Sequence, residues 1–208
     1  MIYYRVDMQS LKAIEKDLGM VRDKSKVALK SAINRTASEL RKRLMKGVRE
    51  EYRLSGKNSK AMTAATKVKK ATAARLSADL TVSSKIGELY DFQVSPKTYY
   101  RGGVGAPKWV KGRVKRASAL ERLSADPKHK AFVVRYRSGH LTVAERVPGK
   151  TMRNGVKEAL KTLYSPSITK MEEMVYKAGL DGRIEDMLAE QCRASVERLL
   201  KAPASFAG

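Results

Sequence analysis

The chain has 208 residues, 42% of them hydrophobic, and carries 44 Lys and Arg against 21 Asp and Glu, a formal net charge of +23. This hydrophobic fraction is sufficient for a packed core and excludes a disordered polycation. A single cysteine, Cys192, excludes an intramolecular disulfide, and its apolar helical setting predicts a small buried residue. With no signal-peptide pattern and no stretch near the roughly 18 apolar residues of a membrane span, we expect a soluble protein without a membrane partner that acts where it is made.

The positive charge lies almost entirely before residue 165. Residues 1–164 hold 38 basic and 14 acidic side chains, a net of +24, whereas residues 165–208 hold 6 and 7, a net of −1. We therefore predict a basic α+β core domain over 1–164 and a C-terminal helical segment over 165–208, which can also pack on the core as one domain. Such an excess of charge indicates a polyanion or an acidic protein as partner.

The clearest element near the N-terminus is a helix over 24–52. It contains no proline, and apolar residues recur along it at three- and four-residue steps. These residues are Leu29, Ile33, Ala37, Leu40, Leu44, Val48 and Tyr52. A helix of about 28 residues is about 42 Å long, enough to cross the face of a small sheet.

The remaining elements follow from alternation, caps and turns. Before the long helix we predict a β segment at 1–7 and a helix at 11–18. After it we predict a short helix around 59–66 capped by Asn58 or Ser59, strands at 75–82 and 90–94, a loop at 96–112 and a strand at 110–116. A hairpin of 131–137 and 140–147 around Ser138-Gly139 follows, and the chain ends with helices from Ile168 and over 183–201 before a mobile tail. The fold class is therefore α+β: an antiparallel sheet with a long N-terminal helix packed on it and C-terminal helices.

Signatures of enzyme chemistry are missing from the sequence. The two histidines, His129 and His140, have no second His or Cys at metal-ligand spacing. The glycine-rich stretch at 102–105 lacks the lysine and helix start of a phosphate loop. Carboxylates such as Asp79 and Asp91 stand singly among basic residues, which disfavours a magnesium-dependent nuclease. We expect no enzyme, no cofactor and no metal.

The densest basic stretch lies at 108–116, where five of nine residues are basic. These are Lys108, Lys111, Arg113, Lys115 and Arg116, and the alternation places several on one strand face. Phosphate groups and acidic protein surfaces both fit such a stretch, and the sequence leaves both open. Aromatic residues are only 6% of the chain, which is low for a protein that stacks single-stranded bases.

A polar triplet interrupts the long helix. Asn34, Arg35 and Thr36 stand in mid-helix, where Asn and Thr are poor helix formers. This predicts side-chain bonds to a neighbouring element or subunit, the alternative being an ordinary exposed helical turn.

Four segments together resemble the phage minor tail protein Z family. They are Ala28-Leu29-Lys30-Ser31-Ala32-Ile33-Asn34-Arg35-Thr36-Ala37 with its continuation to Tyr52, the block Asp91-Phe92-Gln93-Val94-Ser95-Pro96-Lys97, the stretch from Phe132 through Ser138-Gly139-His140 to Arg146, and Leu163-Tyr164-Ser165-Pro166-Ser167-Ile168. They occur in the family's order and span roughly residues 1–190. Ser165 replaces the family's usual glycine, whose positive φ a serine reaches less easily.

The resemblance implies a structural virion protein of a tailed bacteriophage, present in the host cytoplasm during assembly and then in the neck of the particle. Such proteins complete the tail at its head-proximal end and help join it to the head. The implied partners are neck and tail proteins, namely tail terminator, connector or stopper, and tail tube. A closed homo-oligomeric ring is expected, with a hexamer as the guess from tail symmetry.

In that setting Asn34, Arg35, Thr36, Tyr164 and Pro166 are the expected subunit or partner contacts. The basic residues at 108–116 would face DNA in the channel or acidic neck proteins. The alternative function is a sequence-independent DNA-binding or packaging-associated protein, which explains the charge without the ordered segments.

Overall fold

The computed structural model describes residues 2–6, 22–101, 105, 107–124, 130–153, 155 and 157–201. The elements are β1 (Ile2–Val6), α2 (Arg22–Glu51), α3 (Gly56–Ala65), β2 (Thr66–Lys69), β3 (Ala78–Val82), β4 (Gly87–Glu88), the 3-10 turn η2 (Leu89–Asp91), β5 (Gln93–Ser95), β6 (Lys111–Arg113), β7 (Glu121–Arg122), β8 (Ala131–Arg135), β9 (Leu141–Thr151), β10 (Glu158–Thr162), β11 (Tyr164–Ser165), α4 (Ile168–Gly179) and α5 (Arg183–Lys201). All strand pairs between these elements are antiparallel, which confirms the predicted α+β class.

The chain forms two compact units. Unit 1 comprises Met1–Gly47, Met62–Ser84 and Thr169–Gly208, and unit 2 comprises Val48–Ala61 and Lys85–Ile168. The C-terminal helices therefore belong to the same unit as most of α2. The boundary at residue 164 separates a basic region from a nearly neutral one. That it also separates two domains, 1–164 and 165–208, stays a prediction.

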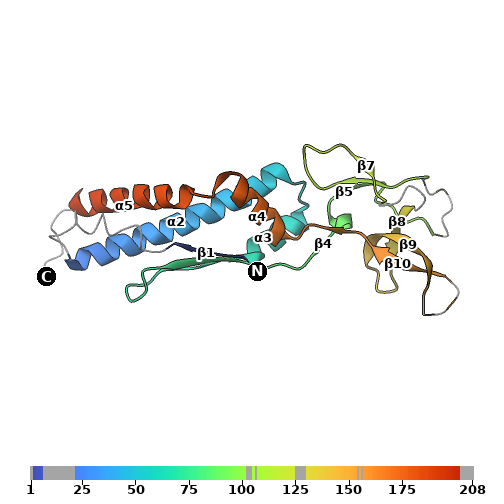
Figure 1. The fold of residues 1–208 in the computed structure, drawn as a ribbon, viewed down its shortest axis with the longest axis horizontal. Helices are drawn as coiled ribbons and strands as arrows, with labels where there is room; N and C mark the ends of the chain where they lie inside the picture. Colours follow the sequence, from blue (N-terminus) through green and yellow to red (C-terminus); the bar gives the residue numbers. More distant parts are fainter. Residues whose placement is uncertain are drawn as a thin grey trace. The chain divides into compact units, whose positions relative to one another are not determined.

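In unit 1, α2 lies between a three-stranded sheet and α5 (Figure 1). The predicted apolar stripe is buried throughout, from Leu29 at 2% exposure to Tyr52 at 1%. Fully burying a side chain such as Ile33 contributes about 1.5–3 kcal/mol. Leu188 and Cys192 of α5 complete the same cluster, and burial raises the pKa of the Cys192 thiol to about 11. The long helix and the buried cysteine are both confirmed.

The sheet of unit 1 has the order β1-β3-β2. The central strand, β3, falls within the predicted strand 75–82. The outer strand β2, Thr66–Lys69, was not predicted, because its first residue was assigned to the end of a helix. The sheet thus uses a segment whose strand character comes from its pairing with β3.

A carboxyl group is buried in unit 1. Glu172 of α4 has no solvent-exposed surface, and its Oε1 lies 2.6 Å from the hydroxyl of Thr66. That hydroxyl also lies 2.8 Å from the carbonyl oxygen of Met62, to which it donates. Since a hydroxyl has one proton, Glu172 must be protonated and donate to Thr66 when both contacts are hydrogen bonds. Burial raises the pKa of Glu172 to about 7, partly offset by the contact with the Thr66 hydroxyl and by the charge of Arg41.

Helix α4 approaches α2 closely at Gly47. A Cβ at this position would lie 2.5 Å from Cγ1 of Val175, far inside van der Waals contact. Glycine is unfavourable inside a helix by about 1 kcal/mol relative to alanine, so its presence at position 47 is explained by this approach.

The described residues of unit 2 form three small antiparallel sheets, with the orders β10-β9-β8, β5-β6-β7 and β11-β4. Val94 and Val110 pack with Ala131 and Val143, which joins the first two sheets in one core. The predicted hairpin is confirmed as β8 and β9, with the turn at Ser138-Gly139. Strand β10 was not predicted.

Three local predictions are wrong in unit 2. The predicted strand 90–94 begins as the 3-10 turn η2, and only Gln93–Ser95 is a strand. The predicted strand 110–116 is regular only over Lys111–Arg113, with a further bridge between Tyr52 and Lys115. The short helix itself is confirmed, but it begins at Gly56 and its cap is Ser55, whose Oγ accepts the N–H of Asn58, in place of Asn58 or Ser59.

Several predicted features lie outside the described residues, namely the helix at 11–18, most of the glycine-rich stretch at 102–105, His129 and the tail at 202–208. Among the helices that the structure describes, none is both long and apolar enough to cross a membrane.

Candidate anion-binding surface

Strand β6 separates basic and apolar residues onto two faces. Val110 and Gly112 are buried, whereas Lys111 is exposed and Arg113 is half-buried on the other face. This alternation is the one expected from the sequence, although the regular strand is shorter. Neighbouring strands fix its register, with β5 on one side and β7 on the other.

The residue directly opposite Lys111 is another cation. In the β6–β7 pair, Lys111 stands opposite Arg122, so the two side chains share one face. On the β5 side, Arg113 stands opposite Gln93, and its Nε donates to Gln93 Oε1 at 2.7 Å. Like charges directly across a strand pair destabilise a sheet, so an anion at this face would relieve an unfavourable interaction.

Cations also surround the single tryptophan of the chain. The guanidinium of Arg122 lies 3.0 Å from the centroid of the Trp109 ring, and the ammonium groups of Lys108 and Lys130 lie at 5.7 and 5.9 Å. Cation–π contact orients these groups beside the indole. Because Arg122 covers one face of the indole, that face is not open to a stacking base.

The last two basic residues of the stretch connect it to the end of α2. Lys115 Nζ forms an ion pair with Glu51 at 2.7 Å, which raises the pKa of Lys115, and it also lies 5.8 Å from the Tyr52 ring. Arg116 donates from its backbone to Glu51 O and from Nε to Arg49 O, both at 2.8 Å. These contacts position β6 within unit 2.

The structure thus divides the five predicted basic residues. Arg113, Lys115 and Arg116 use donors in internal contacts, although Arg116 is also exposed, and Lys108 and Lys111 are exposed. We define the basic surface by its members Lys108, Lys111, Arg122 and Lys130. Sequence reasoning missed Arg122 and Lys130, since β7 is too short to show a pattern and only its pairing brings Arg122 beside Lys111.

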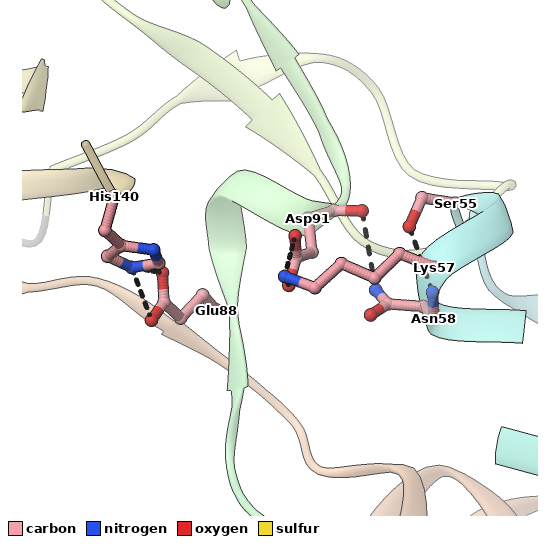
Figure 2. A network of polar contacts seen from close by, with 6 residues as sticks. All are labelled: Ser55, Lys57, Asn58, Glu88, Asp91 and His140. Atoms are coloured by element: carbon pink, nitrogen blue, oxygen red, sulfur yellow. Dashed lines mark hydrogen bonds and ion pairs between the residues drawn. The ribbon is translucent and has the colours of Figure 1, made fainter. Parts of the chain in front are cut away.

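A polar network holds the turn that leads into β5. Lys57 donates to both carboxylate oxygens of Asp91 at 3.0 Å, and Asn58 donates to Asp91 O at 3.4 Å (Figure 2). Both donors stand in the first turn of α3, which Ser55 caps. Because β5 follows directly after η2, this network fixes the strand beside which β6 lies.

The hairpin turn is held in a similar way. His140 Nε2 lies 3.0 and 2.9 Å from the two carboxylate oxygens of Glu88, which follows Gly87 in β4 (Figure 2). The Tyr136 ring stacks on the His140 ring at 6.0 Å. The Ser-Gly-His motif therefore forms a turn with its own internal contacts.

The polar triplet of α2 divides into three environments. Asn34 Nδ2 donates to Ala71 O at 3.1 Å, and the N–H of Ala71 donates to Asn34 Oδ1 at 2.7 Å. Thr36 is fully buried, and its Oγ1 has no hydrogen-bond partner among the described residues. Arg35 is exposed. Internal contacts thus account for Asn34, and of the three residues only Arg35 has an exposed side chain.

Tyr164 and Pro166 are both exposed, Tyr164 by 62%. Tyr164 pairs with Glu88 in the short β4–β11 sheet, and the neighbouring Ile86 is also exposed, by 66%. Ser165 between them is buried in the strand and has no positive φ. The departure from the family's glycine therefore requires no unusual backbone at this position.

Within the described part of the chain, no group of three or more His, Cys, Asp or Glu could hold a metal ion. The two carboxylates considered for a nuclease have cationic neighbours: Asp79 pairs with Arg75 at 2.7 Å and Asp91 pairs with Lys57.

No family model, curated protein or solved structure matches the chain at a significant level.

Proposed function

We propose that the protein is a structural component of a tailed-phage virion, which acts at the head-proximal end of the tail and supports head–tail joining as a ring. Its mechanism is binding, with the basic surface in contact with an anionic partner. The proposal rests on the resemblance of the four ordered segments to the minor tail protein Z family and on the charge of residues 1–164.

The observation that carries the binding role is the placement of Lys111 opposite Arg122. Lys111 and Arg122 share one face of the strand pair, and Lys108 and Lys130 lie around the Trp109 indole, so four cationic side chains gather at one surface and favour an anionic partner.

Acidic neck proteins are favoured over DNA as the anionic partner. The basic surface offers one aromatic ring, and Arg122 covers one of its two faces. Nonspecific DNA binding needs only phosphate contacts, so DNA remains the second candidate. If DNA is the partner, its binding constant should fall steeply with salt. The logarithm of the constant would fall by about one unit per tenfold rise in salt concentration for each phosphate neutralised.

The test is the double charge reversal Lys108→Glu with Lys111→Glu, introduced into a phage genome that encodes this chain. Both side chains are exposed, so the fold should be retained. We expect separate heads and tails in electron micrographs and a large fall in infectious particles. A matched control is Lys60→Glu with Lys67→Glu, which changes the net charge equally at two exposed positions elsewhere.

Normal head–tail joining in the Lys108/Lys111 variant would refute the role of the basic surface. Equal loss of joining in both variants would mean that total charge, and not this surface, matters. Tight, salt-sensitive DNA binding by the purified protein, abolished by the same reversal, would favour the DNA-binding alternative.

A further inference from the structure

The outer edge of β8 carries backbone groups that have no strand partner in the described ranges. β8 is the last strand in the order β10-β9-β8, so β9 is its one neighbour there. Tyr136 N–H donates to His140 O at 2.8 Å, which makes these two residues a hydrogen-bonded pair. Hydrogen-bonded and non-hydrogen-bonded pairs alternate along an antiparallel ladder. The N–H and C=O groups of Ala131, Val133 and Arg135 therefore point away from β9.

The opposite side of the hairpin supports this assignment. Val143 stands opposite Val133, and its carbonyl accepts the N–H of Leu163 at 2.8 Å. Since Leu163 lies on the β10 side of β9, Val143 directs its backbone away from β8. The Val133–Val143 pair is thus non-hydrogen-bonded, and Val133 directs its own groups to the free edge.

A cavity of about 620 Å³ lies along this edge. All five residues of β8 line it, together with residues of β9 and β10 and with Pro96, Thr98, Tyr99, Tyr100, Pro107 and Val110. Its volume falls within the range of sites that enclose a ligand. By the register of the sheet, Phe132, Arg146 and Leu160 lie on one face, so the cavity extends from β8 over this face toward β10.

The lining of the cavity combines apolar and basic groups. Tyr99 and Met152 are exposed by 39% and 36%, so apolar surface is left in water there. Arg135, Arg146 and Lys157 add three positive charges, and none of the described lining residues is acidic. Arg146 is held in place, because its Nη1 donates to Glu158 O at 2.7 Å and its guanidinium lies 5.5 Å from the Phe132 ring.

We propose that the β8 edge binds an extended segment of an acidic partner protein as an added strand. The partner's backbone would pair with Ala131, Val133 and Arg135, its apolar side chains would enter the cavity, and its carboxylates would face Arg135, Arg146 and Lys157. Backbone groups at strand spacing match a polypeptide and not a nucleic acid. The chain's own net charge of +23 favours a foreign acidic segment over a second copy. This inference depends only on the edge and its cavity, so it stands independently of the phage assignment.

The variant that isolates the backbone contact is Arg135→Pro, compared with Arg135→Ala. Both remove the charge, but only proline removes the N–H that points to the free edge. The β8–β9 bonds should survive, because the N–H of Arg135 does not take part in them. Lys157→Glu tests the charge alone at an exposed position.

The probe is a fluorescein-labelled peptide of about seven residues, the length of a typical strand, that alternates Val and Glu. Fluorescence anisotropy measures its affinity for the full chain, with a peptide that alternates Val and Lys as control. We expect the chain to bind the acidic peptide and not the basic one. Arg135→Ala should weaken the affinity for the acidic peptide, and Arg135→Pro should weaken it about tenfold further, because one more hydrogen bond is lost. Lys157→Glu should also weaken binding.

Amide hydrogen exchange shows where the peptide binds. On addition of the acidic peptide, exchange at Ala131, Val133 and Arg135 should slow about tenfold or more, while Phe132 and Val134, already bonded to β9, should change little. The proposal is overturned if the acidic peptide does not bind, if it binds without protecting the three outward amides, or if Arg135→Pro binds as tightly as Arg135→Ala. Equal protection by a single-stranded oligonucleotide would also overturn it and assign the edge to nucleic acid.

Discussion

Replacing Glu172 by Gln should raise the free energy of unfolding in alkaline solution and leave it nearly unchanged in acid. The pKa of Glu172 is raised from 4.5 to about 7 by burial in the folded protein. The folded protein thus holds this proton more tightly than the unfolded chain. The stabilising contribution of Glu172 is therefore fully present below pH 4.5 and is lost as the pH rises through about 7. Glutamine has the shape of the neutral acid and cannot ionise, so the variant escapes this fall.

The magnitude follows from the shift in pKa. From 4.5 to about 7, at about 1.4 kcal/mol per unit, ionisation of Glu172 removes about 3 kcal/mol. This is a large fraction of the roughly 5–15 kcal/mol that stabilises a typical domain. In acid, the amide of Gln at position 172 can donate to Thr66 Oγ1 as the protonated carboxyl does, so the difference there should stay below about 1 kcal/mol.

Urea unfolding followed by far-UV circular dichroism measures both values, at about pH 4 and about pH 8.5 and at equal ionic strength. The matched control is Glu173→Gln. Glu173 accepts hydrogen bonds from Lys177 at 2.8 Å and from Lys170 at 3.1 Å, which lower its pKa. The contribution of Glu173 to stability is present at high pH and lost as the pH falls. In alkaline solution Glu173→Gln should therefore be less stable than the unsubstituted protein, whereas Glu172→Gln should be more stable.

The reasoning is refuted if Glu172→Gln changes the stability equally at both pH values, or lowers it in alkaline solution. Either result would mean that the carboxylate of Glu172 is ionised and stabilised in the folded protein.

Three further substitutions test individual contacts in the two units. Asn34→Ala should lower the free energy of unfolding by about 2 kcal/mol in urea titration, because both bonds to the Ala71 backbone are lost; a change below about 0.5 kcal/mol would contradict this. Thr36→Val should raise it by about 1 kcal/mol, since the buried Oγ1 lacks a partner, and a less stable variant would argue for an unrecognised bond. Gly87→Ala should lower the thermal midpoint by an amount equivalent to about 1–3 kcal/mol, because the new Cβ would lie 2.5 Å from Ser165 Oγ. Adding Ser165→Ala should recover part of that loss, and a double variant no more stable than the single one would exclude this clash.

Elements with a strong local pattern could be predicted from the sequence. The long helix was expected over 24–52 and is found at Arg22–Glu51, because an apolar stripe over seven turns needs no information from elsewhere. The hairpin of β8 and β9 was expected because two alternating runs flank Ser138-Gly139.

Elements defined by pairing could not be predicted. The sequence of β10, Glu158–Thr162, contains one β-branched residue, and it is a strand because β9 extends to Thr151 and offers an edge. The antiparallel strands also fall into several small sheets, a division set by contacts between residues distant in the chain.

The same distinction applies to the candidate site. Lys108 and Lys111 could be found from their density along the chain, whereas Arg122 joins them only through the register of β6 and β7. Asn34 was recognised as an unusual helical residue, but only the position of Ala71 showed that its partner is internal. A single sequence reports which residues are out of place in a helix or strand, and tertiary contacts decide what each one does.

The close approach of Gly47 and Val175 restricts the order in which this sequence can evolve. Alanine at position 47 would improve the helix, yet its Cβ would collide with Cγ1 of Val175. A lineage that first shortens residue 175 can then gain the alanine, whereas the reverse order passes through an overpacked intermediate. The effect of a mutation at position 47 therefore changes sign with the residue at 175, and relatives of this chain should show the two positions changing together.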